Sequence, residues 1–245
     1  MKEKAVTLLL VLGILMFGNA FLERAEQEQT TYTSGVLKNV PVVVIDAGHG
    51  GKDPGKVGIN GALEKDINLS IALRLKSLLE QNNISVVMTR VEDKDLATEQ
   101  ATNRKNEDLR ARAKLIADSA PVVMVSIHQN SYTSEEVYGA QVFYHSGSEE
   151  GKRFGTMVQT HLKHEVPEEN HRVAKANKEY YLLKKAACPA IIVECGFLSN
   201  WKEAALLSTE EYQEKMAFAI HLGILEYINT VAERSDRDGE LWKQK

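Results

Sequence analysis

Five short apolar runs limit the folds that are open to this chain. None of them alternates with polar residues as a half-buried strand would, so each is typical of a strand that is covered on both faces of a sheet. The runs lie at residues 40–46, 84–89, 122–128, 140–145 and 190–194.

Amphipathic helical patterns separate these runs. At residues 64–81 the apolar positions recur with the spacing of one helix face. Ser208 and Glu211 form a capping box that would begin the last helix. Further patterns cover residues 108–118, 154–162 and 208–231. The alternation of strands and helices predicts an α/β fold with a largely parallel, twisted sheet and helices on both faces.

The N-terminus predicts export. Lys2 and Lys4 precede an apolar run at residues 5–18, an order that is typical of a signal peptide. Residues 1–22 are expected to be a signal peptide or an uncleaved membrane anchor, because the apolar stretch reaches about 18 residues, the lower limit of a membrane span. A buried soluble helix is the alternative, but no polar face interrupts the run. The mature protein is therefore expected to work outside the cytoplasmic membrane, with membrane contact only through this segment.

The remaining chain divides by composition. Residues 23–38 are expected to be a polar linker, residues 39–230 a single folded domain, and residues 231–245 a charged, frayed tail. The net charge of −4 gives no reason to expect nucleic acid as a partner. Cys188 and Cys195 are the only two cysteines and are expected to be free thiols. A single disulfide between them is the alternative in an oxidising compartment.

Unusual side chains stand where three of the expected strands end. His49 follows the first apolar run, His128 closes the third and Glu194 closes the fifth, while Glu64 begins the first helix after a glycine-rich loop. The carboxyl ends of parallel strands meet at one edge of a sheet, which is where α/β proteins bind ligands. We therefore expect these four side chains to lie close together.

Two imidazoles and one carboxylate are a common ligand set for catalytic zinc, with a fourth position left for water. His49, Glu64 and His128 could supply that set, and Asp46 and Asp53 could orient the imidazole rings. Taken singly, each histidine is better explained as a turn residue than as a ligand, and Glu64 is better explained as an ordinary first-turn acid favoured by the helix dipole.

Glu194 lies between apolar residues, and buried acids are rare unless they are paired or functional. Cys195 beside it is a candidate nucleophile, but its apolar neighbours favour a small core residue. The loop at residues 48–55 is neither a Walker A nor a dinucleotide-binding motif, and neither a zinc-peptidase H-E-x-x-H motif nor a serine nucleophile elbow occurs.

Four motifs in order resemble the zinc-dependent N-acetylmuramoyl-L-alanine amidases of the type 3 family. They are VVVIDAGHGGKDPG, ALEKDINL, SIHQNS and VECGFLSN. The resemblance implies a sheet of about six strands and makes residues 39–230 a catalytic domain acting on peptidoglycan. It implies that His49, Glu64 and His128 bind one zinc ion and that Glu194 is the catalytic acid/base.

Four further segments resemble the sporulation and germination amidases of the CwlD type: MTRVEDKDLATE, NEDLRARAKLI, YGAQVFYH and EYYLLKKAACPAIIVECGFLSN. Amidases of that type remove the stem peptide in the spore cortex before muramic lactam forms. Gln129 and Ser131 depart from the small residues that many relatives carry, which would reshape the groove. No insertion after His128 is long enough for the autoinhibitory helix of some relatives, and any regulatory protein partner is unidentified.

Candidate contacts to glycan or peptide carboxylates are Asn130, Arg172 and Lys175, for which a solvated loop is the alternative explanation. Two other functions stay open from the sequence. One is a zinc peptidase that cuts within the stem peptide, and the other is a wall-binding module without turnover.

Overall fold

The structure is a computed structural model that describes residues 40–166 and 169–243. The signal or anchor expected at residues 1–22 and the linker expected at 23–38 lie outside these residues. By its contacts, the part of the chain that begins at Pro41 forms one compact unit. No helix among the described residues is both long and apolar enough to cross a membrane.

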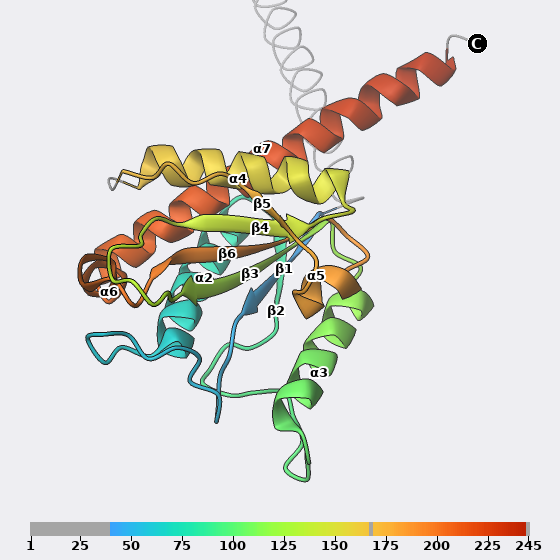
Figure 1. The fold of residues 1–245 in the computed structure, drawn as a ribbon. Helices are drawn as coiled ribbons and strands as arrows, with labels where there is room; N and C mark the ends of the chain where they lie inside the picture. Colours follow the sequence, from blue (N-terminus) through green and yellow to red (C-terminus); the bar gives the residue numbers. More distant parts are fainter. Residues whose placement is uncertain (1–39, 167–168, 244–245) are drawn as a thin grey trace, which may run out of the picture. The chain divides into compact units, whose positions relative to one another are not determined.

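A six-stranded sheet forms the middle layer, with the strand order β2-β1-β3-β6-β4-β5 (Figure 1). Its strands are β1 (Val42–Ala47), β2 (Ser85–Met88), β3 (Val123–Asn130), β4 (Gln141–His145), β5 (Lys175–Asn177) and β6 (Ala190–Phe197). The only antiparallel pair joins β4 to β6, so the sheet is largely parallel. The predicted α/β fold with about six strands is confirmed.

Both faces of the sheet are covered, which explains why the strand runs are continuously apolar. Val43 and Ile45 of β1 belong to a large core cluster, whereas Val44 between them belongs to a smaller cluster on the opposite face. The large cluster is formed with α2 (Glu64–Gln81), α4 (Glu149–Glu165) and α7 (Glu210–Lys243). The smaller one is formed with α3 (Arg104–Asp118) and α5 (Tyr181–Lys185).

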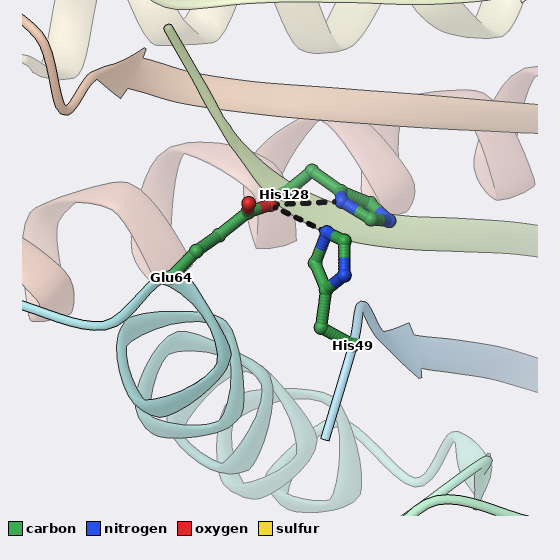
Figure 2. Close-up of side chains that lie close together, drawn as sticks. All are labelled: His49, Glu64 and His128. Carbon is green, nitrogen blue, oxygen red and sulfur yellow. Dashed lines mark hydrogen bonds and ion pairs between the residues drawn. The ribbon is translucent and has the colours of Figure 1, made fainter. Parts of the chain in front are cut away.

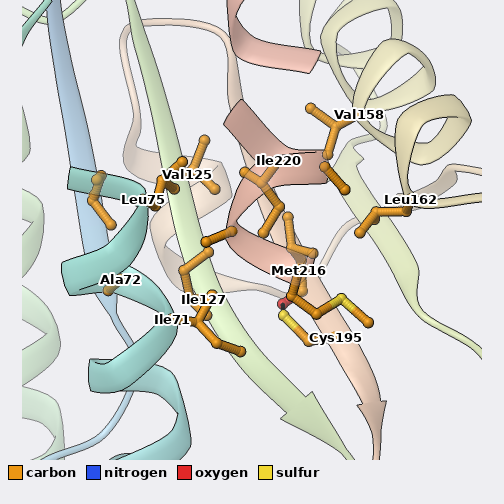
Figure 3. Close-up of a cluster of buried hydrophobic side chains, with 14 of the residues drawn as sticks. Ile71, Ala72, Leu75, Val125, Ile127, Val158, Leu162, Cys195, Met216 and Ile220 are labelled. Carbon is orange, nitrogen blue, oxygen red and sulfur yellow. Dashed lines mark hydrogen bonds between the residues drawn. The ribbon is translucent and has the colours of Figure 1, made fainter. Parts of the chain in front are cut away.

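Figure 3 shows part of the large cluster between the sheet and its helices. Ile71 of α2, Val158 of α4 and Ile220 of α7 are each fully buried there. Burying one such side chain contributes roughly 1.5 to 3 kcal/mol, so this face supplies much of the driving force for folding.

The bounds of α2 are those predicted from the sequence, residues 64–81. Helix α3 begins at Arg104, four residues earlier than predicted. Asn103 is its N-cap and accepts a hydrogen bond from the Asn106 amide at 3.2 Å. The sequence patterns missed α5, α6 (Trp201–Leu207) and the edge strand β5, because each is too short to show a period. The connection from β3 to β4, residues 131–140, contains no helix.

One expectation about the last helix is wrong. Ser208 is the C-cap of α6, not an N-cap, and its hydroxyl donates to the Ala204 carbonyl at 2.7 Å. Thr209 takes the capping role for α7, because its Oγ1 accepts from the Tyr212 amide at 3.3 Å. Helix α7 continues to Lys243, into the charged tail expected from residue 231, and the fraying of that tail stays a prediction.

Candidate active site

His49, Glu64 and His128 lie together at the carboxyl edge of the sheet (Figure 2). His49 follows β1, Glu64 begins α2 and His128 lies in β3. His128 Nδ1 is 3.0 Å and His49 Nε2 is 3.2 Å from the same atom, Glu64 Oε1. The two imidazole rings meet edge to face with centroids 4.9 Å apart.

This arrangement fits a zinc ion. Two ligands at zinc–ligand distances of about 2.0 to 2.1 Å in a tetrahedral site are about 3.3 Å apart. The two nitrogen–oxygen distances of 3.0 and 3.2 Å are close to that value, and one ligand atom from each residue lies within 4.8 Å of the others. The chemistry of the set, two imidazoles and one carboxylate, also suits zinc.

Glu64 is fixed in a buried position by main-chain donors. Its Oε2 accepts from the Lys56 amide at 2.8 Å and its Oε1 from the Gln129 amide at 3.0 Å. Burial alone would raise the pKa of Glu64, but the hydrogen bonds and charges of His128 and His49 hold the pKa far below its usual range. The Gln129 side chain is also buried and donates to Asn68, so it contributes to the wall behind Glu64.

His49 is held in an unusual backbone conformation. Its φ of 61° lies in the left-handed region, which non-glycine residues rarely adopt outside constrained sites. Asp53 Oδ2 lies 2.9 Å from His49 Nδ1, which leaves Nε2 free to face Glu64. Burial would raise the pKa of Asp53, but the hydrogen bond from His49 lowers it below the usual range. The expected role of Asp53 in orienting an imidazole is confirmed.

Two buried arginines fix the main chain that carries His49. Arg90 donates to the Ala47 carbonyl at 2.9 Å and to the Gly48 carbonyl at 3.0 Å. Arg112 donates to the Ala47 carbonyl at 2.7 Å and to the His49 carbonyl at 2.6 Å. Three successive carbonyls therefore point at guanidinium groups, which accounts for the strained turn at His49.

Asp46 serves this arginine network, and its expected role in orienting an imidazole is wrong. Its Oδ1 accepts from Arg112 at 2.7 Å and from Thr89 at 2.8 Å, and its Oδ2 from Ser126 at 2.5 Å. Burial alone would raise the pKa of Asp46, but the charge of Arg112 and the Ser126 hydrogen bond lower it to about 2. The carboxylate is directed at Arg112, whose buried charge it neutralises together with Asp108, which lies 2.8 Å from Arg112 Nε.

The glycines of the loop leave room for the cluster itself. A Cβ at Gly48 would collide with the imidazole ring of His128. A Cβ at Gly55, where φ is 68°, would lie 2.5 Å from Glu64 Oε2 and 2.7 Å from His49 Cδ2. Side chains at these two positions would occupy space that His49, Glu64 and His128 need.

Glu194 lies beside the cluster, in β6 at the position that pairs with His128 of β3. Its Oε1 accepts from the Tyr180 hydroxyl at 3.1 Å, whereas its Oε2 is buried without a partner. Burial raises the pKa of Glu194 above its usual range, and the negative charge of Glu64 adds to this, while His128 and Tyr180 oppose it. Both strands continue two or three residues beyond His128 and Glu194, so these residues do not close their strands as expected.

A cleft of about 610 Å³ opens beside these residues. The cluster, Glu194 and Tyr180 line it, together with Asn130. Sequence patterns missed Tyr180, because it precedes a helix too short to be detected. Arg172 does not line the cleft: it donates to the Tyr138 carbonyl at 2.7 Å and lies over the Phe197 ring at 4.6 Å.

Lys175 lies in the exposed edge strand β5, also outside the cleft lining. Asn130 is thus the one expected carbohydrate or peptide contact that the cleft includes, and its role stays a prediction. Cys188 and Cys195 are free thiols, as expected. Cys195 is fully buried, and its burial raises the pKa of the thiol, so it is a core residue and has no reactive thiolate.

The fold and the site define a class of protein: an α/β domain that carries a His–Glu–His cluster of the metal-binding kind beside a buried glutamate. The sequence pattern of one family, described as N-acetylmuramoyl-L-alanine amidase (Amidase_3), matches residues 43–226. The chain belongs to this family of enzymes. Its activity is accordingly that of an N-acetylmuramoyl-L-alanine amidase, which acts on peptidoglycan.

Individual relatives agree with this assignment. The germination-specific N-acetylmuramoyl-L-alanine amidase of Bacillus subtilis is 36% identical over 93% of this chain and 96% of its own length. Amidase AmiA of Escherichia coli is 27% identical over 77% of this chain and 76% of its own length.

Solved structures show the same fold. The CwlD amidase of Clostridioides difficile, in complex with the GerS lipoprotein, is 41% identical with a TM-score of 0.75. The match covers 78% of this chain and 99% of that one. The catalytic domain of CwlV from Bacillus (Paenibacillus) polymyxa is 34% identical with a TM-score of 0.68, over 77% of this chain and 98% of its own.

Proposed function

We propose that His49, Glu64 and His128 hold one zinc ion, and that Glu194 is the acid/base with which this chain hydrolyses the amide bond between N-acetylmuramic acid and L-alanine. The observation that carries the proposal is the convergence of two imidazole nitrogens on one carboxylate oxygen, at 3.0 and 3.2 Å, beside a buried carboxylate with an unpartnered oxygen. Zinc bound there supplies a Lewis acid that makes water more acidic and polarises a carbonyl group.

The protein's own residues have separate tasks. Glu194 takes the proton of the attacking water at Oε2, the oxygen that has no partner in the structure, and returns it to the amine of the departing L-alanine. The raised pKa of Glu194 suits a group that must hold this proton between the two transfers. Asp53 keeps the His49 ring in place, and the two buried arginines keep its main chain in place.

The test uses the full-length chain on purified peptidoglycan, with mass analysis of the products. We expect new L-alanine N-termini, one zinc ion per chain, and loss of activity with a chelator that added zinc reverses. Release of D-alanine would instead identify a peptidase, and intact peptidoglycan would identify a binding module. Glu194→Gln is expected to bind zinc as the wild type does and to lose turnover, so an active Glu194→Gln would remove Glu194 from the mechanism.

We further propose that the chain acts outside the cytoplasmic membrane and removes stem peptides from spore-cortex peptidoglycan before muramic lactam forms. The support is its 36% identity to a germination-specific amidase over nearly the whole of both chains. Expression in a Bacillus subtilis strain that lacks this relative tests the proposal. We expect muramic lactam to return to the cortex, and cortex without lactam despite exported, active protein would contradict the spore role.

We also propose that this chain acts with a protein partner. The support is a solved relative, the CwlD amidase of Clostridioides difficile, whose structure was determined in complex with the GerS lipoprotein. Zinc content and turnover of the purified chain alone test the need for one, because a chain that binds zinc fully and hydrolyses peptidoglycan without additions requires no activator.

A further inference from the structure

The Tyr180 hydroxyl is the only hydrogen-bond donor to the Glu194 carboxylate among the described residues. The distance from Tyr180 Oη to Glu194 Oε1 is 3.1 Å, and the second oxygen, Oε2, has no partner. Both residues line the cleft, which is also lined by His49, Glu64 and His128. The two oxygens of Glu194 are therefore not equivalent: one is held by the protein and the other is left for chemistry.

The tyrosine itself is fixed before any substrate binds. Its amide donates to Asn177 Oδ1 at 3.0 Å, and its ring packs edge to face against the Phe143 ring with centroids 5.6 Å apart. Burial raises the pKa of Tyr180, and the negative charge of Glu194 raises it further, so the hydroxyl keeps its proton. Tyr180 is thus a constant donor at a fixed place.

Glu194 needs such a constraint because His128 lies near it. Glu194 is the strand partner of His128, and His128 Nδ1 lies 3.0 Å from the negative Glu64. A carboxylate without a second anchor could rotate toward the imidazole and compete with Glu64 for it. The Tyr180 hydroxyl holds the group away from that alternative.

We propose that Tyr180 is a positioning residue for amide hydrolysis, whose hydroxyl holds Glu194 Oε1 so that Oε2 faces the cleft for proton transfer. This inference rests on the proposed role of Glu194. It adds a residue outside the metal ligands and the acid/base, supplied by the short segment between β5 and α5.

The test compares Tyr180→Phe with Tyr144→Phe in the full-length, zinc-loaded enzyme. The first variant removes only the hydroxyl and keeps the ring against Phe143. The control removes a hydroxyl from a half-buried tyrosine of β4 that lies outside the cleft lining. A hydrogen bond to a charged group is strong enough that its loss predicts a fall in kcat of about 10- to 100-fold for Tyr180→Phe. KM, zinc content and Tm should stay as in the wild type, and Tyr144→Phe should keep wild-type kcat.

The same substitution in a Glu194→Asp enzyme distinguishes positioning of the carboxylate from a general disturbance of the site. In Glu194→Asp the carboxylate is one methylene shorter and no longer reaches the tyrosine, so adding Tyr180→Phe should change kcat less than about 2-fold. An equal loss in both backgrounds, wild-type kcat in Tyr180→Phe, or a loss of zinc or Tm would each overturn the inference. Failure of the proposed function is distinguishable, because it would show as wild-type enzyme that releases no L-alanine N-termini or as an active Glu194→Gln.

Discussion

The buried pair of Asp46 and Arg112 makes a prediction about stability that can be measured apart from activity. Asp46→Asn removes the negative charge while keeping the shape of the side chain, and it leaves Arg112 charged and buried. Asp108 still pairs with Arg112 at 2.8 Å in this variant, so the cost lies below the about 3 to 5 kcal/mol of an uncompensated buried charge and is about 2 kcal/mol. We expect the free energy of unfolding at pH 7 to fall by that amount, as measured by urea denaturation of the full chain with chelator present.

The pH dependence follows from the pKa of Asp46, which is about 2 in the folded chain against an ordinary value of 3.8. Because the folded pKa is the lower one, the ionised carboxylate stabilises the fold above pH 3.8, and this stabilisation is lost as the pH falls toward 2. The difference of the two values corresponds to about 2 kcal/mol in all, of which about 1 kcal/mol is lost at pH 3.

The decisive quantity is the difference in unfolding free energy between wild type and Asp46→Asn. It should be constant from pH 7 to pH 5 and about 1 kcal/mol smaller at pH 3. Arg112 keeps its charge throughout, because, against the effect of burial, the nearby carboxylates raise its pKa, so it does not imitate the effect. A difference that is the same at pH 7 and pH 3 would refute the assignment of a depressed pKa to Asp46.

Three further measurements address the site. Gly48→Ala should weaken zinc binding at least about 10-fold, as measured by competition with a chelator, because the new Cβ would collide with the His128 ring. The control is Gly147→Ala, which should bind zinc as the wild type does, because the atom nearest to its Cβ, His145 Nδ1, is 3.6 Å away. Equal affinities in both variants would show that the loop tolerates a side chain. Glu194→Gln should lower kcat about 100- to 10,000-fold with zinc still bound. A chelator should abolish activity and a thiol blocker should leave it unchanged, because Cys195 is fully buried; inactivation by the blocker would revive a cysteine mechanism.

The sequence predicted most of the architecture because the parts that matter are long and periodic. The strands β1, β3 and β6 are each covered on both faces, so their apolar runs were visible without any structure. The elements β5, α5 and α6 were missed, since each is too short for a hydrophobic period or an apolar run to be recognised. Tyr180 was missed together with α5.

The cluster of His49, Glu64 and His128 could be expected because parallel strands end at one edge of the sheet, whereas the contacts that support the cluster could not. Nothing in the spacing of Arg90 or Arg112 indicates that they would reach the carbonyls of residues 47–49. The same limit explains the error for Asp46: a carboxylate close in sequence to a histidine is easily assigned to it, although its nearest cation in space comes from α3, 66 residues away.

The arginine contacts to the loop have a consequence for redesign. Arg90 and Arg112 donate hydrogen bonds to main-chain carbonyl oxygens, so the path of the main chain at residue 49 does not depend on the side chain at that position. Aspartate tolerates a left-handed backbone almost as well as asparagine does. An exchange of His49 for aspartate would therefore keep the path of the main chain, but the shorter side chain would not reach the place of Nε2, 3.2 Å from Glu64 Oε1, so the exchange would remove one donor of the cluster and leave the fold intact.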